Sequence, residues 1–213
     1  MLELSYRKIL AIATPLMFGT LVQSIIIVTD GIFVSELGTV AFDAVGNGGI
    51  MYMSLFMLCR GLGDGTQIII ARKLGEGKNG EIGEVLFNAQ FLQFFLGVFI
   101  FLLFFIFGQS IIAAISESEN IAAAMTDFIK YRAWGIFFAA FMVTMSAFFI
   151  GVGRTGIIMV STLILALSNI FLDYSLIFGK FGFPELGMIG APIASSIAEA
   201  LAFFFLLIYA IKT

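Results

Sequence analysis

The stretch LSNIFLDYSLIFGKFGFPELG, residues 167–187, contains the features that decide the fold. It begins in a long apolar run in which an amide, Asn169, and an acid, Asp173, lie four residues apart. A turn with three glycines and a proline, GKFGFPELG, then separates this run from the next one. An apolar run of about 20 residues is long enough to cross a bilayer as a helix. Because ionisable groups are costly inside a bilayer, Asp173 calls for a specific explanation.

Five more apolar runs of this kind occur along the chain, separated by short segments with glycine or charge. The runs are longer than barrel strands and do not alternate polar and apolar residues, so helices are favoured over a β-barrel. The sequence therefore predicts an all-α, polytopic membrane protein, with a single six-helix transmembrane bundle over residues 1–213. The expected helices lie near 9–35, 44–71, 84–108, 122–150, 156–178 and 188–211.

The composition agrees with this fold class and excludes several functions. The 213 residues are 61% hydrophobic and 12% charged, whereas soluble domains carry about 25% charged residues. With one cysteine and no histidine, the chain has no internal disulfide and no Ser-His-Asp or Cys-His catalytic unit, and a Cys/His zinc site is not expected. No basic run indicates nucleic-acid binding. We expect no enzyme activity and no cofactor.

Lysine and arginine fall mainly on one side of a six-span topology. Cytoplasmic loops carry an excess of these residues, so the pattern predicts a multi-pass protein of the cell (inner) membrane with both termini in the cytoplasm. Lys130 and Arg132, early in the fourth run, weaken the bias slightly. The residues that produce it are Arg7, Lys8, Arg72, Lys73, Lys78, Arg154 and Lys212.

Two acids are expected at one depth in the membrane. Asp30 lies about seven residues before the outer end of the first run, and Asp173 about five before the end of the fifth, which places both roughly 8–10 Å below the outer boundary. Asn169 and Thr162 share the helix face of Asp173. The oxygens of this face are suited to Na⁺, and the carboxylates equally to a proton. The alternative is that these groups serve only as hydrogen bonds between helices.

A second polar group occurs in CRGLGDGTQ, residues 59–67. Arg60 and Asp64 are one helical turn apart and would neutralise each other if buried, and Gln67 could line the same interior. Either a kinked, internally paired helix or a part of the transport cavity is expected here. Pro15 removes a backbone hydrogen bond and predicts a bend in the first helix.

Three segments resemble the multidrug and toxic compound extrusion (MATE) transporters: residues 9–38, 61–78 and 151–195. The resemblance implies a cation-coupled antiporter that exports amphipathic, often cationic compounds in exchange for Na⁺ or H⁺. It assigns the coupling-ion site to Asp30, Asn169 and Asp173, and adds the hydroxyl of Ser195, where the family has threonine. Pro192 and Asp64 depart from the family pattern.

The resemblance covers only the amino-terminal six-helix lobe, because family members have two lobes of six helices. A second lobe is therefore expected as a partner, either a carboxy-terminal half or a second copy of this chain. Three alternatives remain open: a flippase for lipid-linked saccharides, a non-transporting membrane scaffold, and a GxGD intramembrane aspartyl protease, whose motif GLGD at residues 61–64 resembles.

Overall fold

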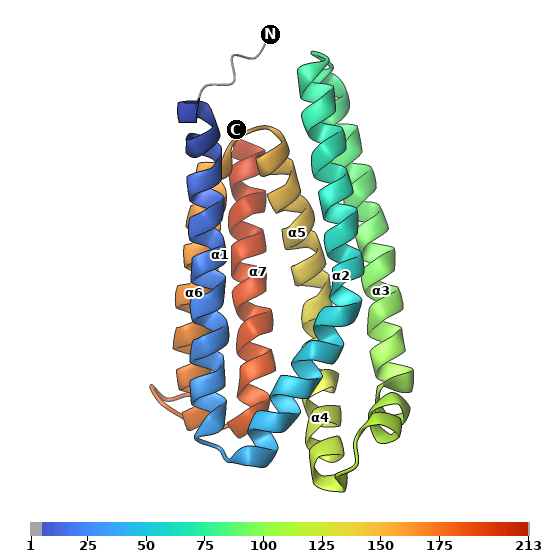
Figure 1. The fold of residues 1–213 in the computed structure, drawn as a ribbon, viewed down its shortest axis with the longest axis vertical. Helices are drawn as coiled ribbons and strands as arrows, with labels where there is room; N and C mark the ends of the chain where they lie inside the picture. Colours follow the sequence, from blue (N-terminus) through green and yellow to red (C-terminus); the bar gives the residue numbers. More distant parts are fainter. Residues whose placement is uncertain (1–5, 213) are drawn as a thin grey trace.

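The computed structural model describes residues 6–212, without the side chains of residues 7–9 and 12. Within that range, six helical segments are long and apolar enough to cross a membrane, which confirms the all-α fold (Figure 1). The helices are α1 (Tyr6–Ser35), α2 (Thr39–Gly75), α3 (Ile82–Ile115), α4 (Glu119–Arg132), α5 (Ile136–Gly151), α6 (Thr155–Phe178) and α7 (Gly190–Lys212).

The fourth span, predicted near residues 122–150, runs over Glu119–Gly151 and contains a 3₁₀ turn that the sequence does not predict. Helix α4 ends at Arg132, a 3₁₀ turn follows over Ala133–Gly135, and α5 begins at Ile136. Apolar periodicity does not detect such a short turn, because Ala133 and Gly135 keep helical backbone angles and no loop interrupts the span. The turn comes directly after Arg132.

Helices α2 and α3 extend beyond the predicted spans. Helix α2 has 37 residues, about 55 Å at 1.5 Å per residue, whereas the hydrocarbon core is about 30 Å thick. The extra turns lead into the α2–α3 loop, where Glu76 accepts ion pairs from Arg72 and Lys78 at 3.3 and 2.9 Å. This loop lies at the end of the bundle where α1 begins and α7 ends (Figure 1).

The bundle is built from two packed groups of helices with α5 between them. Helices α1, α6 and α7 share a core that includes Val22, Leu165 and Ala198. Helices α2, α3 and α4 share another core around Tyr52 and Phe104. A gap between two separately packed groups is where a cavity can form, and the candidate site lies there.

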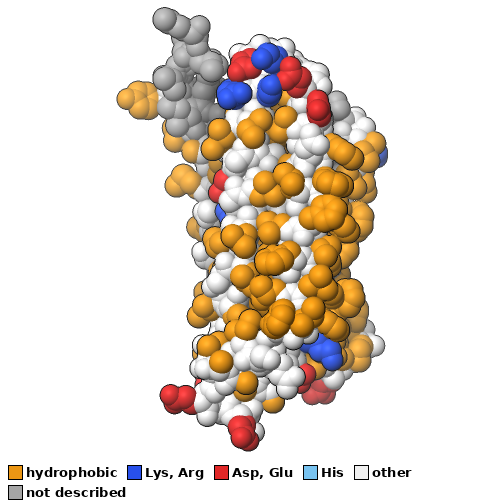
Figure 2. Space-filling model, turned by 90° about the vertical axis from the view of Figure 1, so that its right-hand side faces the viewer, with side chains coloured by type: hydrophobic (Ala, Val, Ile, Leu, Met, Phe, Trp, Pro, Cys, Tyr) orange, Lys and Arg blue, Asp and Glu red, His pale blue; other side chains and the backbone are white. Residues whose placement is uncertain are grey.

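The outer surface is suited to lipid. Figure 2 shows a band of apolar side chains across the middle of one face, with most charged side chains near its two ends. Exposed phenylalanines of α3 illustrate this band, among them Phe87, Phe91, Phe95, Phe99 and Phe105. In water such a surface would be unfavourable, so it indicates a bilayer environment.

Candidate cation and substrate site

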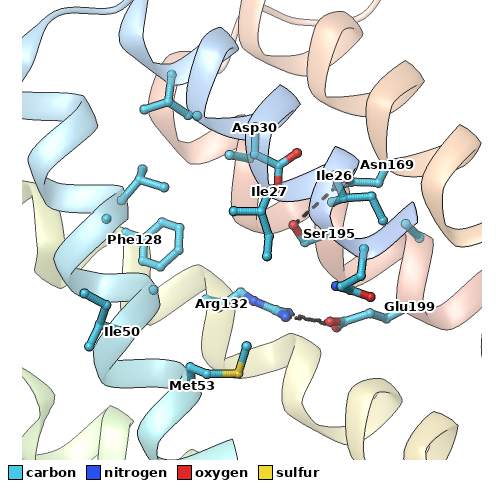
Figure 3. Close-up of a pocket in the computed structure, with 18 of the residues that line it drawn as sticks. Ile26, Ile27, Asp30, Ile50, Met53, Phe128, Arg132, Asn169, Ser195 and Glu199 are labelled. Carbon is cyan, nitrogen blue, oxygen red and sulfur yellow. Dashed lines mark hydrogen bonds and ion pairs between the residues drawn. The ribbon is translucent and has the colours of Figure 1, made fainter. Parts of the chain in front are cut away.

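A cavity of about 510 Å³ lies between the two helix groups (Figure 3). Ligand pockets for drug-sized molecules fall in the range of about 300–1,000 Å³. Apolar side chains form much of its wall, including Ile26, Ile27, Ile50, Met53 and Phe128. Its polar lining residues are Gln23, Asp30, Arg132, Asn169, Ser195 and Glu199.

One end of the cavity is acidic, and we call Asp30, Asn169, Asp173 and Ser195 the carboxylate cluster. The side chains of Asp30 and Asp173 lie within interaction distance of each other, although they come from α1 and α6. Asp173 is completely buried and Asn169 is 2% exposed. The Asn169 amide donates a hydrogen bond to the Ser195 hydroxyl at 3.4 Å, which links α6 to α7.

Close packing of α6 against α7 brings Ser195 to this position. Gly190 begins α7, and a β-carbon there would lie 2.8 Å from the carbonyl carbon of Leu176. Only glycine allows this approach, because a backbone atom cannot rotate away. Ser195 follows little more than one turn later on the face of α7 towards Asn169.

The carboxylate cluster contains oxygens that lack hydrogen-bond donors among the described residues. They are one oxygen of Asp30, both oxygens of Asp173 and the amide oxygen of Asn169, and all are buried. Buried polar atoms are almost always satisfied. Two facing carboxylates cannot hydrogen bond to each other unless one is protonated, and a cation is the other way to satisfy them. A cation or a proton is what these unsatisfied oxygens would need, so the carboxylate cluster is a candidate site for one.

The other end of the cavity contains an ion pair that the sequence does not predict. Arg132 of α4 donates hydrogen bonds to both carboxylate oxygens of Glu199 on α7, at 2.9 and 2.5 Å. The guanidinium also lies over the Tyr52 ring, 4.1 Å from its centroid. The sequence indicates Arg132 only as a charge early in the fourth apolar run, and Glu199 is not among the predicted site residues. The one sequence signal that could have indicated this pair is Glu199, a glutamate within the sixth apolar run.

Four other predicted residues do not line this cavity. Arg60 and Asp64 are exposed on α2, and no ion pair joins them within the described part of the chain, so the condition for internal pairing, burial, is not met there. Gln67 is half-buried, with its backbone carbonyl near Gly151. Thr162 faces Gly19 of α1 and donates to its own helix at Ile158.

Pro15, the predicted bending residue, lies inside α1. The helix is continuous through it from Tyr6 to Ser35. A role for Pro15 in helix movement stays a prediction.

Comparison with known proteins places this geometry in a family. Residues 15–175, most of the chain, match the family model described as MatE. The chain is 26% identical to a probable multidrug resistance protein NorM of Rhizobium meliloti, over 89% of the chain and 40% of the relative. It is 27% identical to a NorM of Synechocystis, over 95% of the chain and 44% of the relative. The chain thus spans less than half the length of these relatives.

Solved structures agree with the sequence matches. The outward-facing conformation of a multidrug resistance MATE family transporter matches 95% of the chain, with a TM-score of 0.89 and 25% identity, over 44% of its own length. A transporter of the MOP superfamily from Pyrococcus furiosus, described as having a binding pocket of reverse polarity, matches with a TM-score of 0.88 at 25% identity. Since the family model covers most of the sequence and the fold agrees, this chain belongs to the MATE family of membrane transporters.

Proposed function

We propose that this chain is one lobe of a cation-coupled antiporter that exports amphipathic, often cationic compounds in exchange for Na⁺ or H⁺. The observation that supports this function is the meeting of Asp30 and Asp173 beside a drug-sized cavity. Asp30 lines the cavity and Asp173 is buried behind its wall, so a coupling ion and a cationic substrate would compete for the charge of this pair.

The proposed cycle follows from that competition. A proton or Na⁺ arriving from outside reduces the negative charge of the carboxylate cluster by one unit. For Na⁺, the oxygens of Asp30, Asp173, Asn169 and Ser195 would replace the hydration shell, since hard cations take oxygen ligands. The attraction that holds a cationic substrate is thereby weakened, and the substrate leaves.

Coupling also requires two conformations with different affinities for the ion. A ligand shifts a conformational equilibrium only if it binds one state more tightly than the other. We propose that α1 moves, since it carries Asp30 and contains Pro15, and that a second six-helix lobe supplies the opposite wall. That lobe is either a carboxy-terminal half or a second copy of this chain.

The test replaces each acid by its uncharged amide, Asp30→Asn and Asp173→Asn. The protein is reconstituted in its natural assembly into proteoliposomes, and dye efflux is driven by an imposed Na⁺ or pH gradient. Each variant is expected to lose gradient-driven efflux by at least tenfold while inserting normally. The gradient that drives dye efflux by the parent protein, Na⁺ or pH, identifies the coupling ion.

The matched control is Asp127→Asn, which removes an exposed acid of α4 outside the cavity. It should transport like the parent. Undiminished efflux in both cluster variants would refute the site, and absence of efflux in the parent under either gradient would refute the proposed activity.

Two of the alternatives raised by the sequence lose their support. Membership of a transporter family excludes the protease reading, and Asp64 is exposed on α2 rather than placed in the carboxylate cluster. A saccharide flippase is expected to have several cations in its cavity, whereas among the described lining residues Arg132 is the only one, and it is paired.

A further inference from the structure

We propose that the Arg132–Glu199 ion pair is a second recognition element of the cavity, one that binds a carboxylate on the substrate. The preferred substrates would then be amphipathic zwitterions, with the cationic group at Asp30 and the anionic group on Arg132. This inference rests on the proposed function, because it concerns the compound that the same cavity holds.

The Arg132 guanidinium has a fixed position, which is set by Glu199, Tyr52 and Gly135. Glu199 takes two of the guanidinium donors, and the Tyr52 ring supports its face. Gly135, in the 3₁₀ turn after α4, leaves the space beside it: a β-carbon at that position would lie 2.5 Å from Nη1 of Arg132 and 2.3 Å from the Ser196 hydroxyl. A guanidinium fixed in this way loses little conformational entropy when it binds a further group.

Arg132 keeps hydrogen-bonding capacity after pairing with Glu199. A guanidinium has five N–H donors, and the two bonds to Glu199 are those that the structure forms within residues 6–212. The side chains of Arg132 and Glu199 remain 12% and 14% exposed, and both border the cavity. The arginine can therefore donate hydrogen bonds to a second carboxylate while it remains bonded to Glu199.

The placement of charges gives the substrate a direction. Figure 3 shows the ion pair across the pocket from Asp30, with apolar side chains such as Ile27 and Met53 nearby. Among the described lining residues, Arg132 is the only cation. A molecule with an amine at one end, a carboxylate at the other and an apolar body between them matches this order. A plain organic cation would use only the Asp30 end.

The alternative is that the pair only joins α4 to α7. The two possibilities differ in ligand preference, so the experiment uses a matched pair of probes: a zwitterionic rhodamine with a free benzoic acid, and its methyl ester, which is a cation. Binding of each is measured by fluorescence polarisation to the protein in its natural assembly in nanodiscs, without an ion gradient.

We expect the parent protein to bind the zwitterion about tenfold more tightly than the ester, the effect of one charge-assisted hydrogen bond of about 1.4 kcal/mol. The double variant Arg132→Gln/Glu199→Gln should lose this preference, so that the zwitterion and the ester bind to it with equal affinity. Arg132→Lys keeps the charge but not the planar fork, and should reduce the preference only in part. Asp30→Asn should weaken both probes alike, because both have the cationic group.

Equal affinities of the parent for the two probes would overturn the inference and leave the proposed transport function intact. Equal weakening of both probes in the double variant would assign the pair to helix packing and overturn it as well. If neither probe bound to the parent, the cavity would not be an organic-ligand site, and both proposals would fall together.

Discussion

At the scale of single residues, Arg132 and Glu199 compensate each other's charge, and both side chains are largely buried. Removing one partner of a buried pair leaves an uncompensated charge, which is more costly than removing both. Substitutions of these two residues therefore test how the bundle tolerates a buried charge, in addition to testing the proposed contact with substrate.

The single variants Arg132→Gln and Glu199→Gln should each destabilise the protein by about 3–5 kcal/mol, because the remaining charge has no partner. The double variant Arg132→Gln/Glu199→Gln should be more stable than either one. Thermal unfolding in detergent, followed by intrinsic fluorescence, measures the three variants. Strictly additive losses would contradict the pairing.

The sequence predicts most of the carboxylate cluster, but it does not predict the Arg132–Glu199 ion pair. The sequence predicts Asp30, Asn169 and Asp173 because their depths follow from helix rise and from the ends of the apolar runs. Ser195 entered only through family resemblance. The partnership of Arg132 with Glu199 depends on how α4 ends and which face α7 presents, and neither follows from periodicity.

At the scale of helices, the contact between α6 and α7 holds Ser195 beside Asn169. Its closest point is Gly190, where a β-carbon would lie 2.8 Å from one backbone atom of Leu176 and 2.9 Å from the nitrogen of Ile177. A side chain here can be accommodated only if the two helices separate. Glycine at this point is a requirement of packing between helices.

Gly190→Ala should therefore destabilise the protein by about 1–3 kcal/mol through overpacking, lowering the midpoint of thermal unfolding by several degrees. The control is Gly83→Ala in α3, where a β-carbon meets no atom within 4 Å and alanine is the better helix former. An unchanged midpoint for Gly190→Ala would show that α7 does not pack on α6 as closely as described.

The break between α4 and α5 also belongs to this scale. Mid-helix 3₁₀ turns often mark hinges or strained segments. Here the turn comes directly after Arg132, and its last residue, Gly135, gives the guanidinium room. The sequence predicts the span correctly but misses the turn, because the turn keeps helical backbone angles and leaves no gap in the span.

For the whole molecule, the direction of insertion follows from charge rather than from packing. The α2–α3 loop contains Lys78 and lies at one end of the bundle, whereas Glu117 lies in the α3–α4 connection at the other end. The excess of lysine and arginine near the first of these ends predicts that it faces the cytoplasm.

Cysteine labelling in intact cells tests this orientation in a Cys59→Ala background. Glu117→Cys should react with a membrane-impermeant maleimide, while Lys78→Cys should react only after the cells are permeabilised. Both positions are exposed, so burial does not explain a difference between them. Labelling of Lys78→Cys in intact cells would reverse the proposed topology.

The sequence by itself determined the number of spans and the class of fold, and it predicts a common depth for the two acids. Each of these depends on distances along the chain: the length of an apolar run against the thickness of a bilayer, and the rise of a helix per residue. The same arithmetic predicts that Asp30 and Asp173 lie at a common depth. It does not predict that the two side chains meet.

Only the tertiary structure decided which residues share a cavity. It separated the helices into two groups, with Asp30 on the wall of one and Arg132 on the wall of the other, and it left Arg60 and Asp64 outside. The physical reason is that rotation about a helix axis and the choice of neighbours are set by close packing between helices. Contacts such as Gly190 against Leu176, or Gly135 beside Arg132, are properties of two surfaces together, and neither surface specifies them alone.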